Sequence, residues 1–181
     1  MAKMKHKFSY LLLLVCFSIL FLAAACEKDD ICAATTATTP RLVIGFYDAA
    51  DPETYKALTS LRILGVRADS DTLLIDSDRS DRDSIFVPLR TQDMVTTYKL
   101  ILNSADDGTT MEETGNTDIL TINYTPNDVF ISRACGYKTN YNLTSFEVAD
   151  DGDRWIAATP AIEITNQLVE NEFTTHVKIF H

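Results

Sequence analysis

Cysteine is the residue type whose placement suggests the most chemistry in this chain of 181 residues. Cys26 follows an apolar run that ends in the small residues Ala23, Ala24 and Ala25. A cysteine directly after such a cleavage site is typical of a bacterial lipobox, in which the thiol takes a diacylglycerol and the freed amine a further acyl chain. The sequence therefore predicts lipid attachment, for example of palmitate, at Cys26.

The residues before Cys26 have the layout of a secretory leader. Lys3, Lys5 and Lys7 form a cationic start, and residues 11–22 form an apolar stretch. The alternative is an uncleaved membrane helix, because an apolar run of roughly 18 residues is at the short end of what spans a bilayer. The small residues before Cys26 favour cleavage, and we expect residues 1–25 to be removed as a signal peptide.

Two further cysteines can pair with each other. Cys16 leaves with the leader and Cys26 takes the lipid, so Cys32 and Cys135 remain, and we expect a disulfide in an oxidising compartment. Closing a loop of roughly 100 residues stabilises the fold by about 4.7 kcal/mol in the chain-entropy model. Two free thiols or a redox pair are the alternatives, although the Cys-x-x-Cys spacing of redox enzymes is missing. Six residues from Cys26 to Cys32 reach at most about 20 Å, so the bridge would hold the domain near the bilayer.

Modification and metal binding are the other chemistries that the acidic residues 69–83 suggest. Thr72 and Ser84 each follow an aspartate and precede an apolar residue, as in the O-glycosylation acceptor of Bacteroidetes envelopes. A calcium loop of EF-hand type beginning at Asp76 would need Gly and Glu where the chain has Asp81 and Val87. We expect a solvated loop here, with a loose calcium site as the alternative.

Aromatic and histidine residues give weaker signals. Tyr137, Tyr141 and Trp155 could form an exposed platform for sugars, although a place in the core explains them more simply. His176 alternates with polar neighbours and is expected to face solvent, and His181 is the last residue. We therefore expect no catalytic residue, no cofactor and no metal site.

The elements that must position these residues are mostly strands. Apolar alternation and abundant Thr, Val, Ile and aromatic residues indicate strands separated by turns, with a two-turn helix at residues 51–58 and a turn at residues 125–128. The expected strands are residues 42–47, 61–66, 72–75, 84–89, 95–102, 117–124, 129–134, 141–148, 155–165 and 173–180. This pattern predicts an all-β fold, an antiparallel β-sandwich of Greek-key or immunoglobulin-like type, with a barrel as the alternative. The expected organisation is a leader (1–25), a lipidated acidic and Ala-Thr tether (26–40) and one sandwich domain (41–181).

The net charge of the chain argues against some classes of binding partner. The chain has 16 Lys and Arg against 26 Asp and Glu, a net charge of −10, and the leader removes three of the lysines. Nucleic acid is therefore not an expected partner, because phosphates need clustered cations. The same acidity repels anionic headgroups, so we expect the folded domain to stand off the membrane surface.

Several segments resemble a family of Bacteroidetes lipoproteins described as a domain of unknown function. They are Cys-Glu-Lys-Asp-Asp-Ile-Cys from Cys26, Thr-Pro-Arg-Leu-Val-Ile-Gly-Phe-Tyr-Asp from Thr39, Val-Pro-Leu-Arg-Thr from Val87 and Tyr-Thr-Pro-Asn-Asp-Val-Phe-Ile-Ser-Arg-Ala-Cys-Gly-Tyr-Lys from Tyr124. The resemblance implies an envelope lipoprotein and assigns no activity. It also suggests partnership with an outer-membrane β-barrel protein encoded nearby.

The expected location is the outer membrane. Residues 27–30, Glu-Lys-Asp-Asp, resemble the tag that sends Bacteroidetes lipoproteins to the cell surface, and a solvated tether facing the periplasm is the alternative. The leading functional hypothesis is a non-enzymatic envelope module that binds another protein or has a structural role. The alternatives are a surface module that binds carbohydrate, and an envelope hydrolase.

Overall fold

The computed structural model describes residues 17, 31–67, 72–76, 79–110 and 113–181. Contacts divide the chain into two units, one of residues 1–36 with 131–136 and the other of residues 37–130 with 137–181. The larger unit contains the sheets and the core. The smaller unit contains the disulfide and the turn between two long strands.

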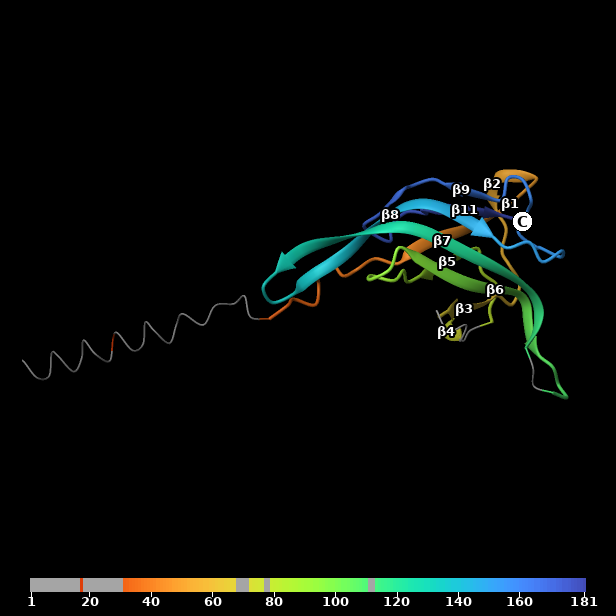
Figure 1. Cartoon of the computed structure of the whole chain (residues 1–181), viewed down its shortest axis with the longest axis horizontal. Helices are drawn as coiled ribbons and strands as arrows, with labels where there is room; N and C mark the ends of the chain where they lie inside the picture. Colours follow the sequence, from red (N-terminus) through yellow and green to blue (C-terminus); the bar gives the residue numbers. More distant parts are fainter. Residues whose placement is uncertain (1–16, 18–30, 68–71, 77–78, 111–112) are drawn as a thin grey trace, which may run out of the picture. The chain divides into compact units, whose positions relative to one another are not determined.

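Strands dominate the described residues (Figure 1). They are β1 (Leu42–Asp48), β2 (Asp51–Tyr55), β3 (Arg62–Val66), β4 (Thr72–Asp76), β5 (Ser84–Val87), β6 (Val95–Asp106), β7 (Glu113–Ser132), β8 (Gly136–Val148), β9 (Ile162–Ile164), β10 (Leu168–Val169) and β11 (Val177–Phe180).

The strands form two sheets, which confirms the expected all-β sandwich. One sheet has the order β2-β1-β11-β9, with β5 also paired to β1, and the other has the order β10-β8-β7-β6-β3-β4. β1 and β11 run parallel, with Ile44 opposite Val177, whereas β1 runs antiparallel to β2 and β5, and β6 runs antiparallel to β3 and β7. The alternative of a single closed barrel is not what the structure shows.

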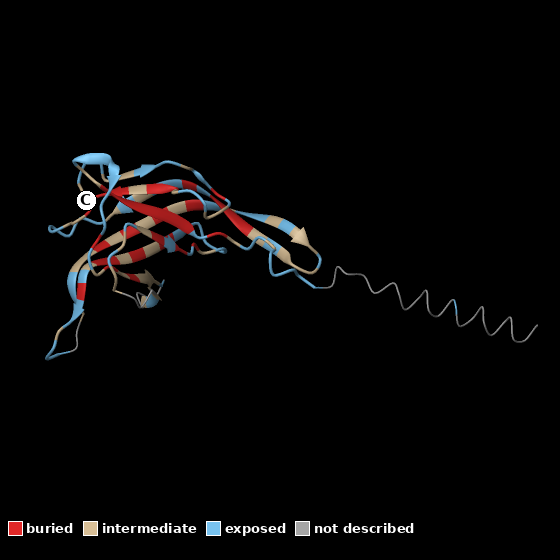
Figure 2. Cartoon of the chain, turned by 180° about the vertical axis from the view of Figure 1, so that it is seen from behind, coloured by how far each residue is buried: buried red, intermediate tan, exposed pale blue. Residues whose placement is uncertain are grey.

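A shared apolar core lies between the sheets. Figure 2 shows buried residues along the strands of both, and every residue of β1 from Leu42 to Tyr47 is buried, as expected for a central strand. In β7 the alternate residues Leu120, Ile122 and Tyr124 face this core. Burial of each such side chain contributes about 1.5–3 kcal/mol, which makes this alternation the main source of stability.

The short helix expected at residues 51–58 is wrong. Residues 51–55 form β2, which turns back onto β1 and places Tyr55 opposite Tyr47 with ring centroids 4.3 Å apart. Asp48 accepts a hydrogen bond from the amide of Ala50 at 2.9 Å and so favours a tight turn. A helix of two turns is marginal by itself, and pairing with a buried strand replaces it.

The turn expected at residues 125–128 is also wrong, because β7 continues through it to Ser132. The pairing of β6 with β7 reaches only Val95 opposite Asn123. Pro126 lies beyond the part of β7 that pairs with β6. Because no residue of β6 lies opposite it, its lack of an N–H removes no hydrogen bond between these two strands. The strands expected at 117–124 and 129–134 are therefore one strand.

The strand expected at residues 155–165 is reduced to β9, Ile162–Ile164. Pro160 lacks the N–H that a strand in this sheet would need. The segment before it is held differently, since Asp118 Oδ2 accepts a hydrogen bond from the amide of Ile156 at 2.9 Å. Asp118 continues the core-facing alternation of β7 and is itself fully buried. Burial raises the pKa of its carboxyl, and the hydrogen bond from the Ile156 amide opposes that rise.

His176 is buried, and the expectation that it faces solvent is wrong. Its amide donates to the carbonyl of Val43 at 3.0 Å, and its ring Nδ1 accepts from the amide of Val43 at 3.2 Å. The imidazole thus takes the place of a backbone acceptor at the start of the β1–β11 pairing. The alternation of polar and apolar residues does not predict the burial of His176. A polar side chain can lie in the core when its ring nitrogen accepts a hydrogen bond from a buried amide.

No helix within the described part of the chain is long and apolar enough to cross a membrane. The expected leader lies outside the described residues except for Phe17.

The buried histidine predicts a pH-dependent stability. Burial lowers the pKa of His176 below 6.5, with a smaller opposing effect of Glu172, and burial also lowers the pKa of His181. The unfolded chain therefore binds more protons than the folded chain once the pH falls below 6.5. Each histidine then reduces the free energy of unfolding by up to about 1.4 kcal/mol per pH unit, until its folded-state pKa is reached.

Urea unfolding at several pH values between about pH 7.5 and about pH 5 measures this slope. The variant His176→Asn keeps an acceptor near the position of Nδ1 without a titrating ring, and we expect a shallower slope for it. His181→Asn is the matched control for the second histidine. An unchanged slope in His176→Asn would contradict the assignment to His176.

Candidate functional site

A small apolar pocket lies at the β4 end of the six-stranded sheet. Its volume is about 150 Å³. Residues of β3 and β4, the segment that follows β5 and the start of β6 form its walls. They are Gly65, Val66, Arg67, Leu73, Ile75, Pro88, Leu89, Arg90, Thr96, Thr97 and Tyr98.

Three buried tyrosines fix the segment that follows β5. Tyr98 from β6 donates its hydroxyl to the carbonyl of Pro88. Tyr141 from β8 donates to the carbonyl of Leu89 at 3.1 Å, and Tyr124 from β7 donates to the carbonyl of Arg90 at 2.9 Å. Three adjacent strands of one sheet thus satisfy three successive carbonyls, which holds this wall of the pocket in place.

These hydroxyls sit in an apolar environment. Burial raises the pKa of Tyr141 to about 12 and also raises the pKa of Tyr98 and Tyr124. The rings of Tyr124 and Tyr141 meet edge to face with centroids 5.3 Å apart. The hydroxyls therefore stay protonated and act as donors at any physiological pH.

Arg90 joins the pocket wall to β3. Its guanidinium donates to the carbonyl of Val66 at 2.8 Å and to the carboxylate of Asp93 at 3.1 Å. Its amide donates to Thr96 Oγ1 at 3.1 Å, and that hydroxyl also contacts the Tyr124 hydroxyl at 2.7 Å. A charged side chain and a buried hydroxyl thus set the shape of the pocket on its β6 side.

The edge of the six-stranded sheet lies beside this pocket. β4 is the last strand in the order of that sheet and pairs with β3. Two of its apolar side chains are exposed, Leu73 by 49% and Leu74 by 43%, and Leu73 also lines the pocket. Leucines on an edge strand beside an apolar pocket are the arrangement that strand-addition sites use.

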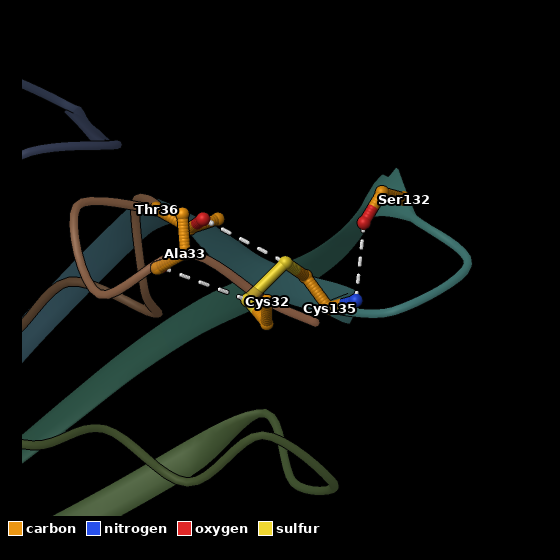
Figure 3. The surroundings of a disulfide bond; sticks show 5 residues. All are labelled: Cys32, Ala33, Thr36, Ser132 and Cys135. Carbon is orange, nitrogen blue, oxygen red and sulfur yellow. Dashed lines mark hydrogen bonds between the residues drawn. A yellow bond between two sulfur atoms is a disulfide. The ribbon is translucent and has the colours of Figure 1, made fainter. Parts of the chain in front are cut away.

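The disulfide lies in the smaller unit (Figure 3). Cys32 and Cys135 are bonded with an S–S distance of 2.07 Å, which fits the pairing expected from the cysteine count. Cys135 is the last residue of the turn between β7 and β8, and its amide donates to Ser132 Oγ at 3.1 Å. Gly136 follows with a φ of 70°, the left-handed conformation that a tight hairpin favours and glycine adopts without strain.

Contacts on the N-terminal side of the bridge form a second turn. Thr36 donates its amide to the carbonyl of Ala33 at 2.9 Å, and its hydroxyl lies 3.6 Å from the sulfur of Cys135. The residues after Cys32 therefore have a defined conformation in the smaller unit.

The other predicted site residues are not brought together. Cys26 lies outside the described residues. Thr72 is the first residue of β4, and Ser84 is the first residue of β5 and donates its hydroxyl to Asp83 at 2.9 Å. Both remain predicted O-glycosylation positions, and residues 77 and 78 of the acidic run between them lie outside the described residues.

The aromatic platform proposed from the sequence is not formed. Tyr141 is fully buried, and Trp155 packs against the core while its indole nitrogen donates to the carbonyl of Leu100 at 3.3 Å. Tyr137 alone of the three is exposed, by 68%. The platform does not form because Tyr141 occupies an inward position of β8, where its hydroxyl donates a hydrogen bond to the carbonyl of Leu89.

No group of three or more His, Cys, Asp or Glu residues with the geometry of a metal site occurs in the portion that the structure describes.

The pocket and its tyrosine wall were not found from the sequence. Tyr98 and Tyr124 lie in the expected strands 95–102 and 117–124, but strand alternation does not indicate which distant carbonyls their hydroxyls meet. Pro88 is the sequence feature that indicates this segment. It ends β5 at Val87, so the carbonyls that follow have no strand partner and need other hydrogen-bond donors.

Removal of one tyrosine hydroxyl tests this wall. In Tyr141→Phe the buried carbonyl of Leu89 loses its donor, so we expect a loss of about 1–3 kcal/mol in the free energy of unfolding. Hydrogen exchange at residues 89–90 should become faster. Tyr137→Phe is the matched control because that ring is exposed, and its change should stay within about 0.5 kcal/mol. Equal effects of the two substitutions would contradict the role given to Tyr141.

Comparison with known proteins gives a family and no activity. No curated protein and no solved structure shows a significant match to this chain. A family model matches residues 60–181, which include β3 to β11 and Cys135. The chain therefore belongs to the family of unknown function DUF6452.

Proposed function

We propose that the protein is a lipid-anchored protein of the bacterial cell envelope. The bond between Cys32 and Cys135 supports an oxidising compartment. The leader and the small residues before Cys26 support export and acylation. Two or more acyl chains on Cys26 would hold the protein stably at the membrane, where one chain would not.

We further propose that its role is to bind another envelope protein and that it is not an enzyme. The observation behind this proposal is the β4 edge, where exposed Leu73 and Leu74 lie beside an apolar pocket. An extended segment of the partner would pair with β4 and place an apolar side chain in the pocket. An outer-membrane β-barrel protein, suggested by the family resemblance, is the proposed class of partner.

The proposed location is the outer membrane. Residues 27–30 resemble a tag for display on the cell surface, and a periplasm-facing domain on an acidic tether is the alternative. Protease treatment of intact cells separates the two locations: digestion supports the surface, and protection until lysis supports the periplasm.

Lipid attachment is tested by mass spectrometry of the N-terminal peptide from purified membranes. We expect a mature chain that begins at Cys26 and carries acyl chains, and we expect the variant Cys26→Ser to lack them. Cys16→Ser is the matched control, since that residue would leave with the leader. A mature terminus elsewhere would refute the anchor.

The partner site is tested with a photocrosslinking amino acid placed at position 74 or at position 168. Leu74 and Leu168 are equally exposed, at 43% each, but Leu168 lies in β10 at the opposite end of the sheet. We expect a specific crosslinked envelope protein from position 74, lost when Leu73→Lys is added because a charge on the edge opposes pairing. The same product from both positions would contradict the assignment to β4.

A further inference from the structure

Two large aromatic side chains are exposed next to each other on β7 and β8. Phe130 is 56% exposed and Tyr137 is 68% exposed, and their ring centroids are 5.3 Å apart. Inward rings of the same strands, Tyr124 and Tyr141, are buried in the core. Exposed aromatic side chains that lie against each other are more typical of a contact surface than single exposed rings are.

The covalent chain limits how far this pair can lie from the site of the proposed anchor. Tyr137 is two residues after Cys135, which is bonded to Cys32 with a Cα–Cα distance of 4.9 Å. Cys32 in turn is six residues after Cys26. By this covalent route Tyr137 can be no further than roughly 33 Å from an acylated Cys26.

The local charge differs from that of the whole chain. Residues 130–138 contain Arg133 and Lys138 and no acidic residue, although the net charge of the chain is −10. Arg133 is exposed, and Lys138 donates to the carbonyl of Glu170 at 3.4 Å. Residues 130–138 therefore do not themselves repel anionic headgroups, and Asp128, which accepts a hydrogen bond from the Thr139 hydroxyl at 2.7 Å, is the acidic residue nearest to them in the chain.

We propose that the Phe130–Tyr137 pair enters the headgroup region of the bilayer to which Cys26 is anchored, an inference that rests on the proposed anchoring. Tyrosine suits this region because its ring is apolar and its hydroxyl is polar. The partner at this surface is phospholipid, while the β4 edge, in another part of the sheet, stays available to protein.

The test places a fluorescent probe in the pair. The variants Tyr137→Trp and Phe173→Trp each add one indole at an exposed aromatic position, since Phe173 is 93% exposed. Wild-type protein supplies the signal of Trp155 as the baseline. Each full-length mature protein is reconstituted, with its acyl chains, in vesicles of phosphatidylethanolamine and phosphatidylglycerol with or without brominated acyl chains.

We expect the added emission of Tyr137→Trp to shift to shorter wavelength and to be quenched by the brominated lipid, while that of Phe173→Trp stays unchanged. Equal behaviour of the two variants, with acyl chains present, would overturn the membrane contact and leave the anchor standing. The same variants coupled at Cys26 to a maleimide lipid make the test independent of natural acylation. Quenching there with no acyl chain on the natural protein would refute the anchor alone.

Discussion

Hydrogen bonds from tyrosine hydroxyls to three successive carbonyls are the constraint on which much of the larger unit depends. Tyr98, Tyr141 and Tyr124 reach Pro88, Leu89 and Arg90 from three neighbouring strands. Without these donors the three carbonyls of the segment that leaves the five-stranded sheet would lose their partners, at a cost of about 1–3 kcal/mol for the buried carbonyl of Leu89. The contacts therefore link the two sheets, and they also position Arg90 and the pocket beside β4.

Buried polar side chains also form hydrogen bonds with backbone groups elsewhere in the core. His176 supplies a ring nitrogen to the amide of Val43, and Asp118 supplies an oxygen to the amide of Ile156. The contact of His176 holds the residues just before β11 against the core, and the contact of Asp118 does the same for the residues before β9. Such residues have little freedom to change, because an apolar side chain in their place would leave a backbone amide buried and unpaired.

Much of the sheet framework could be predicted from the sequence, because period-two alternation reports which face of a strand is buried. β5, β6 and the inward residues of β7 follow this rule, whereas β1 is apolar and buried on both faces, as a central strand is. The errors occur where a longer-range interaction outweighs a local signal. Pro126 lies beyond the pairing of β6, residues 51–55 find a partner in β1, and His176 satisfies a backbone amide. The pocket could not be predicted, since it depends on which carbonyls three distant tyrosines meet.

The residues that match the family model do not include the start of the folded domain. It covers residues 60–181 and so omits β1, although β5 and β11 both pair with β1. It likewise contains Cys135 without Cys32. A folding domain made from this chain therefore has to begin before Leu42, and before Cys32 if the bridge is to form.

The bridge has one more consequence, for a chain that is cut. Cys32 and Cys135 close a covalent ring that includes residues 33–134. A single nick anywhere in that ring leaves both fragments joined through sulfur, so neither fragment can diffuse away from the N-terminal segment. If the N-terminus carries the proposed anchor, shedding of the whole domain would need a cut before Cys32, or a reductant as well as a protease.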